Sequence, residues 1–263
     1  MRVLFLLTIP ILLLSKVYYA KVEPYEIYIV KSAVSGEVIF SKIELEGKNI
    51  KSGKIVQIDD KLDRIDLSIS RERLKILDSM LNINQKTLLA IKESLQRQKR
   101  YYNRIEELPT IPTSKRDSAF YNYISTKTKY LSIKEKIESL KQEKLNLKFK
   151  IDTLKDRISK KSIYLRDRFL YKLLVHKRDF VNIGTPIAKV GDLSKAKLTI
   201  FIENGEIDNI DSKRIYIDGE ETNYKISKIW KIADEKFISS YRAEIILNNP
   251  KYRFSTLLKV EFK

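Results

Sequence analysis

The chain has 263 residues, and its 52 Lys and Arg against 34 Asp and Glu give a formal net charge of +18. It contains no cysteine, which excludes disulfide bonds and a cysteine-linked lipid anchor, and its one histidine, His176, excludes a histidine metal cluster. The lysines are interleaved with glutamates as on a solvated helix surface, and no stretch matches a nucleic-acid-binding fold, so we expect no nucleic-acid partner.

The N-terminal segment predicts export from the cytosol. Arg2 precedes an apolar run of 12 residues, 3–14. Such a run is too short for a membrane-spanning helix, which needs about 20 residues, and it suits the core of a signal peptide. Ala20 is a candidate residue before the cleavage site. We therefore assign residues 1–20 to a signal peptide or, if uncleaved, to an N-terminal membrane tether.

Residues 27–60 have the pattern of short strands separated by turns. Their central part, VSGEVIFSKIELEGKNIKSGKIVQID, contains apolar β-rich runs, and a β-branched residue, Ile50, stands three positions before Gly53. We expect the first half of a small β-sandwich here.

The next segment, 61–162, predicts a long helical hairpin. No glycine occurs between residues 54 and 183, and the only prolines there are Pro109 and Pro112, near the middle. Apolar residues recur every seven positions in both arms, with charged residues between them, which is the pattern of a coiled coil. The rows of the first arm are Leu67, Leu74, Leu81, Leu88, Leu95 and Tyr102, with Ser70, Leu77, Asn84, Ile91, Gln98 and Ile105. Those of the second are Ala119, Thr126, Ile133, Leu140, Leu147 and Leu154, with Tyr123, Tyr130, Ile137, Lys144, Ile151 and Ile158.

The two arms match each other in an antiparallel register. Facing residues of such a hairpin have position numbers with a constant sum, and Leu81 with Leu140, like the other pairs of the leading rows, gives 221. Half of 221 falls between the two prolines, so the turn near 109–113 is predicted twice. Ser114 and Asp117 form a candidate capping box for the second arm. A parallel homodimeric coiled coil is the alternative to the hairpin.

Residues 163–192 repeat the features of the first β segment. KLLVHKRDFVNIGTPIAKVGD has an apolar run, a polar turn, and Val181 three positions before Gly184. Residues 193–263 then alternate apolar and polar positions in four or five predicted strands, with a short helix near 206–210.

Each of the two β segments resembles half of a lipoyl or biotinyl carrier domain. In the order half-motif, hairpin, half-motif, β-barrel, the chain from about residue 27 onward resembles the periplasmic adaptor family, also called membrane fusion or HlyD-like proteins. The implied fold is mixed α and β and elongated: a lipoyl-like β-sandwich interrupted by a long antiparallel coiled-coil hairpin and followed by a small β-barrel. One departure is that Phe254-Ser255-Thr256-Leu257 stands where the family usually has a Pro-Gly pair before the last strand.

The resemblance implies a non-enzymatic adaptor, without cofactor or bound metal, in the periplasm at the inner membrane of a Gram-negative bacterium. Its partners would be an inner-membrane transporter, ATP- or proton-driven, a TolC-like outer-membrane duct, and further copies of itself in a ring. At the hairpin tip, Arg104, Leu108 and Ser114 match in type the family residues that dock on the duct, although the arginine-to-serine spacing is one residue shorter.

Two other functions stay open on sequence grounds. One is a cell-envelope coiled-coil structural or tethering protein without a role in transport. The other is a lipoyl-type carrier, because Asp60-Lys61-Leu62 resembles the turn that holds the modified lysine of such carriers. The hairpin replaces the exposed β-turn of the carriers, so we expect Lys61 to lie at a helix base and to remain unmodified.

Overall fold

The computed structural model describes residues 16–233, 239–248 and 251–263, so the apolar run at 3–14 lies outside the described residues. The chain forms two compact units. One consists of Ile58–Ser162, and the other of the described residues before and after it.

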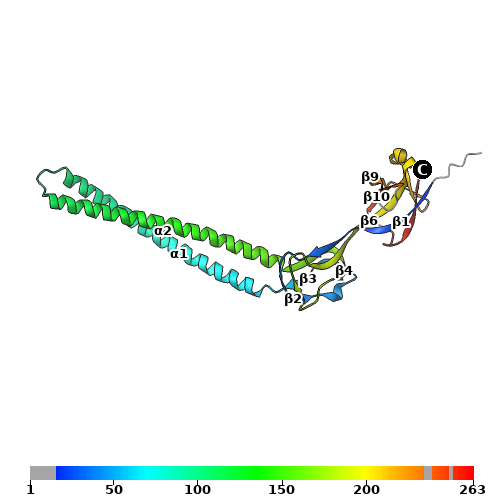
Figure 1. Cartoon of the computed structure of the whole chain (residues 1–263), viewed down its shortest axis with the longest axis horizontal. Coiled ribbons are helices and arrows are strands. Elements are labelled where there is room, and N and C mark those ends of the chain that lie inside the picture. Colours follow the sequence, from blue (N-terminus) through cyan, green and yellow to red (C-terminus); the bar gives the residue numbers. More distant parts are fainter. Residues whose placement is uncertain (1–15, 234–238, 249–250) are drawn as a thin grey trace, which may run out of the picture. The chain divides into compact units, whose positions relative to one another are not determined.

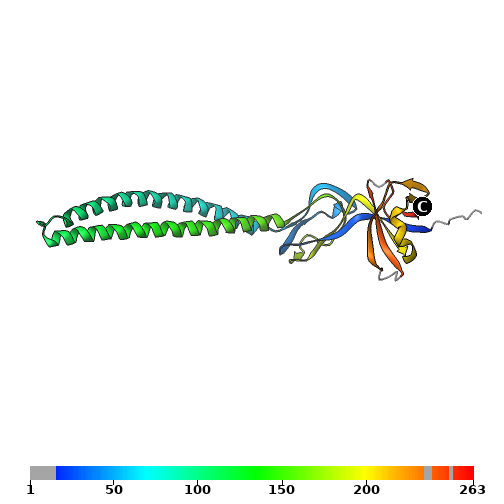
Figure 2. The same cartoon turned by 90° about the horizontal axis from the view of Figure 1, so that it is seen from above.

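The inserted unit is the helical hairpin. α1 (Lys61–Glu106) has 46 residues and α2 (Thr113–Lys160) has 48. At 1.5 Å per residue each helix is about 70 Å long. The two helices run antiparallel and side by side (Figures 1 and 2). A single intramolecular hairpin therefore forms, as the heptad pattern predicts.

The buried side chains of the hairpin helices all belong to the predicted seam rows. They are four residues of α1 and five of α2: Ser70, Leu77, Leu81, Ile105, Ala119, Ile137, Leu140, Ile151 and Leu154. Leu77, Leu81, Ile137 and Leu140 form one apolar cluster, against which Leu88, Ile133 and Leu147 pack.

Contacts between the helices confirm the register. They include three ion pairs and one ring contact, and the position numbers of each pair add up to between 216 and 222: Asp66–Lys150, Asp78–Lys144, Asp63–Arg157 and Tyr102–Phe120. Lys144, a charged residue in a predicted seam row, is tolerated there because its ammonium group pairs with Asp78 on the facing helix.

The helix starts differ in part from expectation. At α1, the Asp59 carboxylate accepts a hydrogen bond from the backbone N–H of Lys61 at 3.0 Å, as expected for an acid at a helix N-terminus. At α2 the expected capping box is wrong. The residue before the helix, its N-cap, is Pro112, two positions before Ser114, so α2 begins at Thr113 and no side chain caps it. The proline ring fixes φ but carries no oxygen that could accept hydrogen bonds from the N–H groups of the first turn, so α2 starts without a side-chain cap.

The other unit is built from strands that the hairpin interrupts in sequence. Its elements are β1 (Val17–Lys31), β2 (Gly36–Ser41), a 3₁₀ turn (Ile43–Leu45), β3 (Lys48–Ile58), β4 (Ser162–Leu173), β5 (Phe180–Val181), β6 (Pro186–Glu203), a 3₁₀ helix (Asn204–Ser212), β7 (Ile215–Ile217), β8 (Glu220–Thr222), β9 (Ile226–Ala233), β10 (Ser240–Asn248) and β11 (Leu257–Phe262). The strand order is β5-β2-β3-β4-β6-β1-β11-β7-β8, and β10 pairs with both β6 and β9.

Two lobes share the strand pair β1–β6, which is antiparallel (Figure 1). In the first lobe, the later part of β1 and the earlier part of β6 join β2 to β5, which corresponds to the lipoyl-like sandwich. In the second, the remaining parts of β1 and β6 join β7 to β11. We call these the lipoyl-like lobe and the barrel lobe. Among the described strands the barrel lobe is an open sheet with β8 and β9 at its edges.

The barrel lobe begins earlier in the sequence than expected. Val17 to Lys21 pair with β11, and Tyr18, Ala20 and Val22 are buried in its core. The boundary assigned at residue 20 thus falls inside β1. Tyr18 also donates a hydrogen bond to the Glu206 carboxylate, and burial, followed by this bond, raises the pKa of the Tyr18 hydroxyl.

The segment Phe254-Ser255-Thr256-Leu257, which leads into the last strand, has an unusual backbone conformation at Ser255. Ser255 has a φ of 70°, in the left-handed region that favours glycine. The backbone there is held by two hydrogen bonds of 2.8 Å with Val22, one from the Ser255 N–H and one to the Thr256 carbonyl. Serine therefore occupies a conformation that glycine adopts at lower cost.

Candidate functional site

The three predicted docking residues all lie at the hairpin tip. Arg104 is exposed in the last turn of α1, Leu108 follows that helix in the connecting loop and is about half exposed, and Ser114 is exposed in the first turn of α2. No hydrogen bond or ion pair joins any two of them in the described hairpin. The loop thus presents an apolar side chain, flanked by a cation and a hydroxyl group.

The loop is fixed by an arginine that was not among the predicted residues. The Arg116 Nη2 donates hydrogen bonds to the carbonyl oxygens of Leu108 and Pro109, at 2.9 and 3.1 Å. The Leu108 N–H also bonds the Ile105 carbonyl at 3.3 Å, and Ile105 is buried. Because its backbone is held from both helices, Leu108 is presented in a defined position and not on a free loop.

Arg104 belongs to a row of three arginines. Arg97, Arg100 and Arg104 line a hollow of about 500 Å³ on α1, together with Asn103 and Glu107. Positions three, four and seven apart share one face of a helix, so the three arginines lie on the same face of α1. A guanidinium fork binds carboxylates with two parallel hydrogen bonds, which makes this face suited to an acidic partner.

Behind the loop, aromatic side chains link the two helices. Tyr102 stacks on Tyr123 with ring centroids 5.9 Å apart and also contacts Phe120 at 5.6 Å. Tyr121, whose side chain is 70% exposed, meets the edge of Phe120. The antiparallel register predicts part of this cluster, because the constant sum of 221 places Tyr102 opposite residue 119, next to Phe120. The rings add rigid apolar surface between the two helices near the turn, and exposed aromatic groups are frequent anchors of protein interfaces.

Charge divides the hairpin into two halves. The tip half, residues 84–137, has 12 Lys and Arg against 5 Asp and Glu, a net charge of +7. The base half, 59–83 with 138–161, has 13 against 10, a net charge of +3. All ion pairs found in the described hairpin join residues of the base half. The tip half is therefore a basic surface whose cations its own few acids do not neutralise.

Residues weighed for other functions lie elsewhere. Lys61 is the first residue of α1 and is exposed. His176 is exposed in the turn between β4 and β5, with its Nδ1 3.7 Å from the Asp179 carboxylate. Within the described part of the chain, no helix combines the length and apolar character that a bilayer crossing requires.

Comparison with known proteins identifies the fold. No family model and no curated protein matches the sequence. Among solved structures, MacA from Actinobacillus actinomycetemcomitans matches with a TM-score of 0.71 at 17% identity, covering 95% of this chain and 78% of that one. The membrane fusion protein Spr0693 from Streptococcus pneumoniae R6 matches with a TM-score of 0.62 at 8% identity, covering 95% and 99%. The chain has the membrane fusion protein fold.

A third match bears on the hairpin. A MacA-MexA chimeric protein that contains the Pseudomonas aeruginosa MexA α-hairpin domain aligns with a TM-score of 0.54 at 18% identity, over 95% of this chain and 78% of the chimera. The membrane fusion protein fold confirms the predicted fold class, including the hairpin inserted between two β segments.

Proposed function

We propose that the chain is a periplasmic adaptor of the HlyD-like family in a tripartite efflux or export system. The barrel lobe would contact an inner-membrane transporter, and the hairpin tip would dock on an outer-membrane duct. The protein would reside in the periplasm of a Gram-negative bacterium, associated with the inner membrane. The observation that carries the proposal is the membrane fusion protein fold with an exposed, rigidly held hairpin tip.

The adaptor role requires no catalysis by this chain, because the transporter supplies the energy. In the described residues no three His, Cys, Asp or Glu side chains gather as a metal site would require. What the tip offers is a binding surface: Leu108 as an apolar anchor, the hydroxyl of Ser114, and the arginine row that contains Arg104.

The charge of the tip half specifies the chemistry of the docking partner. A basic surface of net charge +7 attracts an acidic surface and repels another basic one. We therefore expect the duct to present carboxylates around an apolar recess that takes Leu108. Electrostatic attraction of this kind weakens as added salt shortens the Debye length, which is about 8 Å at physiological ionic strength.

The test is the double substitution Arg104→Asp with Leu108→Asp, expressed in cells that depend on the pump. Export should be lost, while the helical circular dichroism and its melting temperature stay nearly unchanged, because both side chains are exposed. The matched control is Leu89→Asp with Lys92→Asp. It makes the same change of charge and polarity within the tip half, at exposed positions of α1 away from the turn, but keeps Arg104 and Leu108. Export should therefore fall far less than in the tip variant.

Normal export by the well-folded tip variant would remove the tip from the docking site. A cell-envelope structural protein without a transport role predicts that neither double variant alters export. The same assay therefore separates the adaptor from that alternative.

A further inference from the structure

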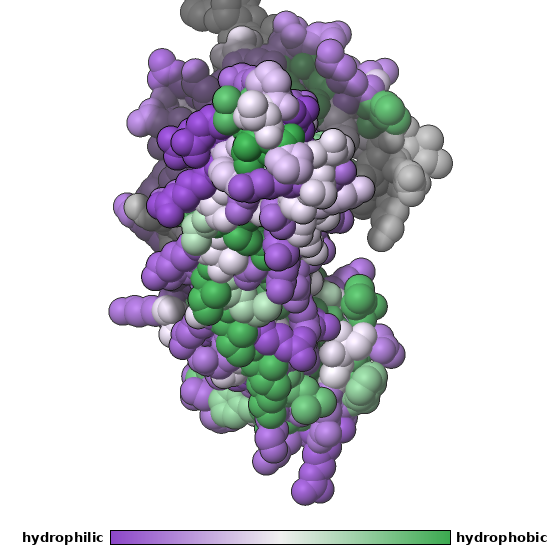
Figure 3. Space-filling view, turned by 90° about the vertical axis from the view of Figure 1, so that its left-hand side faces the viewer, coloured by the Kyte–Doolittle hydropathy of each residue, from purple (hydrophilic) through white to green (hydrophobic). Residues whose placement is uncertain are grey.

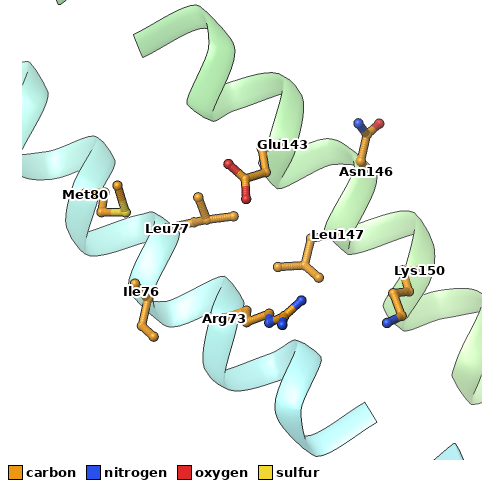
Figure 4. A pocket seen from close by; sticks show the side chains of 8 residues that line it. All are labelled: Arg73, Ile76, Leu77, Met80, Glu143, Asn146, Leu147 and Lys150. Carbon is orange, nitrogen blue, oxygen red and sulfur yellow. The ribbon is translucent and has the colours of Figure 1, made fainter. Parts of the chain in front are cut away.

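A groove on the hairpin and a hollow on the barrel lobe differ in chemistry. The groove, of about 470 Å³, lies between α1 and α2 and is lined mainly by apolar side chains of the seam and its border, among them Ile76, Leu77 and Leu147 (Figure 4). In the space-filling view, hydrophobic side chains form a band between hydrophilic ones on the face that is drawn (Figure 3). The groove thus continues the coiled-coil seam, whereas the hollow on the barrel lobe has a polar lining.

The hollow on the barrel lobe, which we call the barrel hollow, is formed by four segments of the chain. Its volume is about 450 Å³. Its lining includes Tyr25 of β1, Lys195 of β6, Asn248 of β10, and the segment 223–227, which connects β8 to β9 and begins β9. Asn248 and Lys195 are direct partners in the pairing of β10 with β6, so an amide and an ammonium group stand side by side.

The lining of the barrel hollow is basic and polar. It has two ammonium groups, two phenol groups, two amide groups and one hydroxyl group, and none of the described residues that form it is acidic. The ammonium groups belong to Lys195 and Lys225, and no ion pair within the described chain involves either of them. Lys197 on β6, by contrast, pairs with the Glu244 carboxylate at 3.4 Å. The negative charge that complements Lys195 and Lys225 must therefore come from a ligand.

The walls of the barrel hollow are held in place by the fold. Tyr224 packs against the core of the barrel lobe. The Ser227 hydroxyl oxygen accepts a hydrogen bond from the Ile246 N–H at 3.2 Å, which ties the start of β9 to β10. The Lys195 ammonium group lies 5.8 Å from the ring centroid of Tyr25, within the range of a cation–π contact. The lining groups are thus largely positioned before a ligand binds, which reduces the entropy lost on binding.

The outward face of the sheet continues from the barrel hollow to Trp230. Along β10, every second side chain between Asn248 and Arg242 is buried in the core, so these two residues point to the same, outward side. They are about 20 Å apart along the strand at about 3.3 Å per residue. The Trp230 ring centroid lies 4.3 Å from the Lys228 ammonium nitrogen and 4.7 Å from the Arg242 guanidinium carbon. A second basic and aromatic position therefore lies on the face that contains the hollow.

This combination of groups is suited to a carbohydrate that carries acid groups. Amide and hydroxyl side chains donate and accept hydrogen bonds, as the hydroxyl groups of a sugar do. Aromatic rings offer flat apolar surface to the C–H groups of a sugar ring. Ammonium groups bind the acid groups through charge-assisted hydrogen bonds. In the barrel hollow the neutral polar groups outnumber the cations by five to two, which favours a hydroxyl-rich ligand over a nucleic-acid strand with a phosphate at every unit.

We propose that the barrel hollow binds one unit of an acidic oligosaccharide, whose following units extend along β10 towards Trp230. Lys195 and Lys225 pair with acid groups of the ligand, and Asn248 bonds its hydroxyl groups. The proposal goes beyond the adaptor function and does not rest on it, because the hollow lies on the barrel lobe and takes no part in docking at the hairpin tip.

The experiment is a titration of the purified full-length protein with tetragalacturonate, a linear tetramer of an acidic sugar. Binding is measured by calorimetry and by the fluorescence of Trp230, the one tryptophan of the chain. We expect tetragalacturonate to bind about tenfold or more tightly than maltotetraose, a neutral tetramer, because only the former meets the unpaired ammonium groups. The fluorescence of Trp230 should change as the tetramer binds.

Three variants separate the barrel hollow from general attraction to a basic protein. Lys195→Glu should weaken the binding of tetragalacturonate about tenfold or more, because it places a carboxylate in the hollow. The matched control is Lys51→Glu, the same change at an exposed lysine of β3 in the lipoyl-like lobe, and it should weaken binding by less than about twofold. Asn248→Ala, which leaves the charge unchanged, should weaken binding about threefold or more through the lost hydrogen bonds. All three side chains are exposed, so the circular dichroism should stay unchanged.

Several outcomes would overturn the proposal. Absence of binding would do so, and so would equal affinity for maltotetraose. Equal losses in Lys195→Glu and Lys51→Glu, with no loss in Asn248→Ala, would reduce the binding to general charge attraction. Tighter binding of pentathymidylate, which carries four phosphates between its nucleosides, would make a nucleic-acid strand the ligand instead. Unchanged fluorescence during binding would refute the path towards Trp230. Export by the tip variant is a separate readout, so failure here leaves the adaptor function untouched.

Discussion

Removing one seam side chain provides a direct test of the hairpin register. In Leu140→Ala, the truncated side chain is only 6% exposed and lies in the cluster with Leu77, Leu81 and Ile137. The substitution deletes three carbon groups, each worth about 0.8 kcal/mol when buried. A two-helix seam is open to water at its edges and collapses more readily than a globular core. We therefore expect a loss of about 2–3 kcal/mol, at the lower end of the range for Leu→Ala.

The assay is urea unfolding of the full-length protein followed by circular dichroism at the helical band. α1 and α2 contribute 46 and 48 helical residues, and the other described helical segments are 3₁₀ turns of 3 and 9 residues, so the signal reports the hairpin. Leu89→Ala is the matched control, because that leucine is 62% exposed, and it should change stability by no more than about 0.5 kcal/mol. Equal losses in both variants would refute the register.

Three further predictions concern other parts of the chain. Hydrogen bonds from Arg64 and Lys150 lower the pKa of Asp60 and Asp66, respectively, so both carboxylates stabilise the folded hairpin above about pH 4 and lose this effect as the pH falls through their folded-state pKa. The melting temperature of the helical signal should fall over that interval, and less steeply in Asp66→Asn; an identical pH profile would contradict the assignment. Ser255→Gly should stabilise the barrel lobe by up to about 1 kcal/mol, because glycine adopts the left-handed conformation of this residue without strain. Unfolding can be followed by the fluorescence of the one tryptophan, which lies in β9. A destabilised variant would show that the left-handed backbone is not strained. The intact mass of the purified protein should show no removal beyond Lys16, since β1 begins at Val17, and no lipoyl or biotinyl addition on Lys61; either mass change would contradict the corresponding expectation.

The hairpin was predictable because one periodic signal repeats over both arms. Leu81 and Leu140 are buried where the heptads place them, and the register follows from arithmetic on their positions. The tip was predictable only in location. That Arg116 holds the loop, and that Ser114 does not cap α2, depends on the path of the backbone after Pro112, which local patterns do not determine.

The start of the barrel lobe was obscured by overlapping signals. Residues 17–20 follow an apolar run typical of a signal peptide, and a small residue at position 20 matches a cleavage site. Residues 17–20 form a strand with alternating buried and exposed side chains because they pair with β11, which lies more than 200 residues away in the sequence. A long-range partner of this kind leaves no local trace in the sequence.

The shared strand pair has a consequence for the order of folding. Val22 of β1 pairs with Leu198 of β6, so neither β lobe is complete until the whole hairpin has been synthesised. The hairpin itself grows outward from its turn through contacts between near neighbours in sequence, which form quickly. Once it closes, the Ile58 N–H bonds the Lys161 carbonyl at 2.8 Å, and the ends of β3 and β4 are brought together. The coiled coil thereby shortens the loop that separates the two halves of the sheet and reduces the entropy lost when they pair.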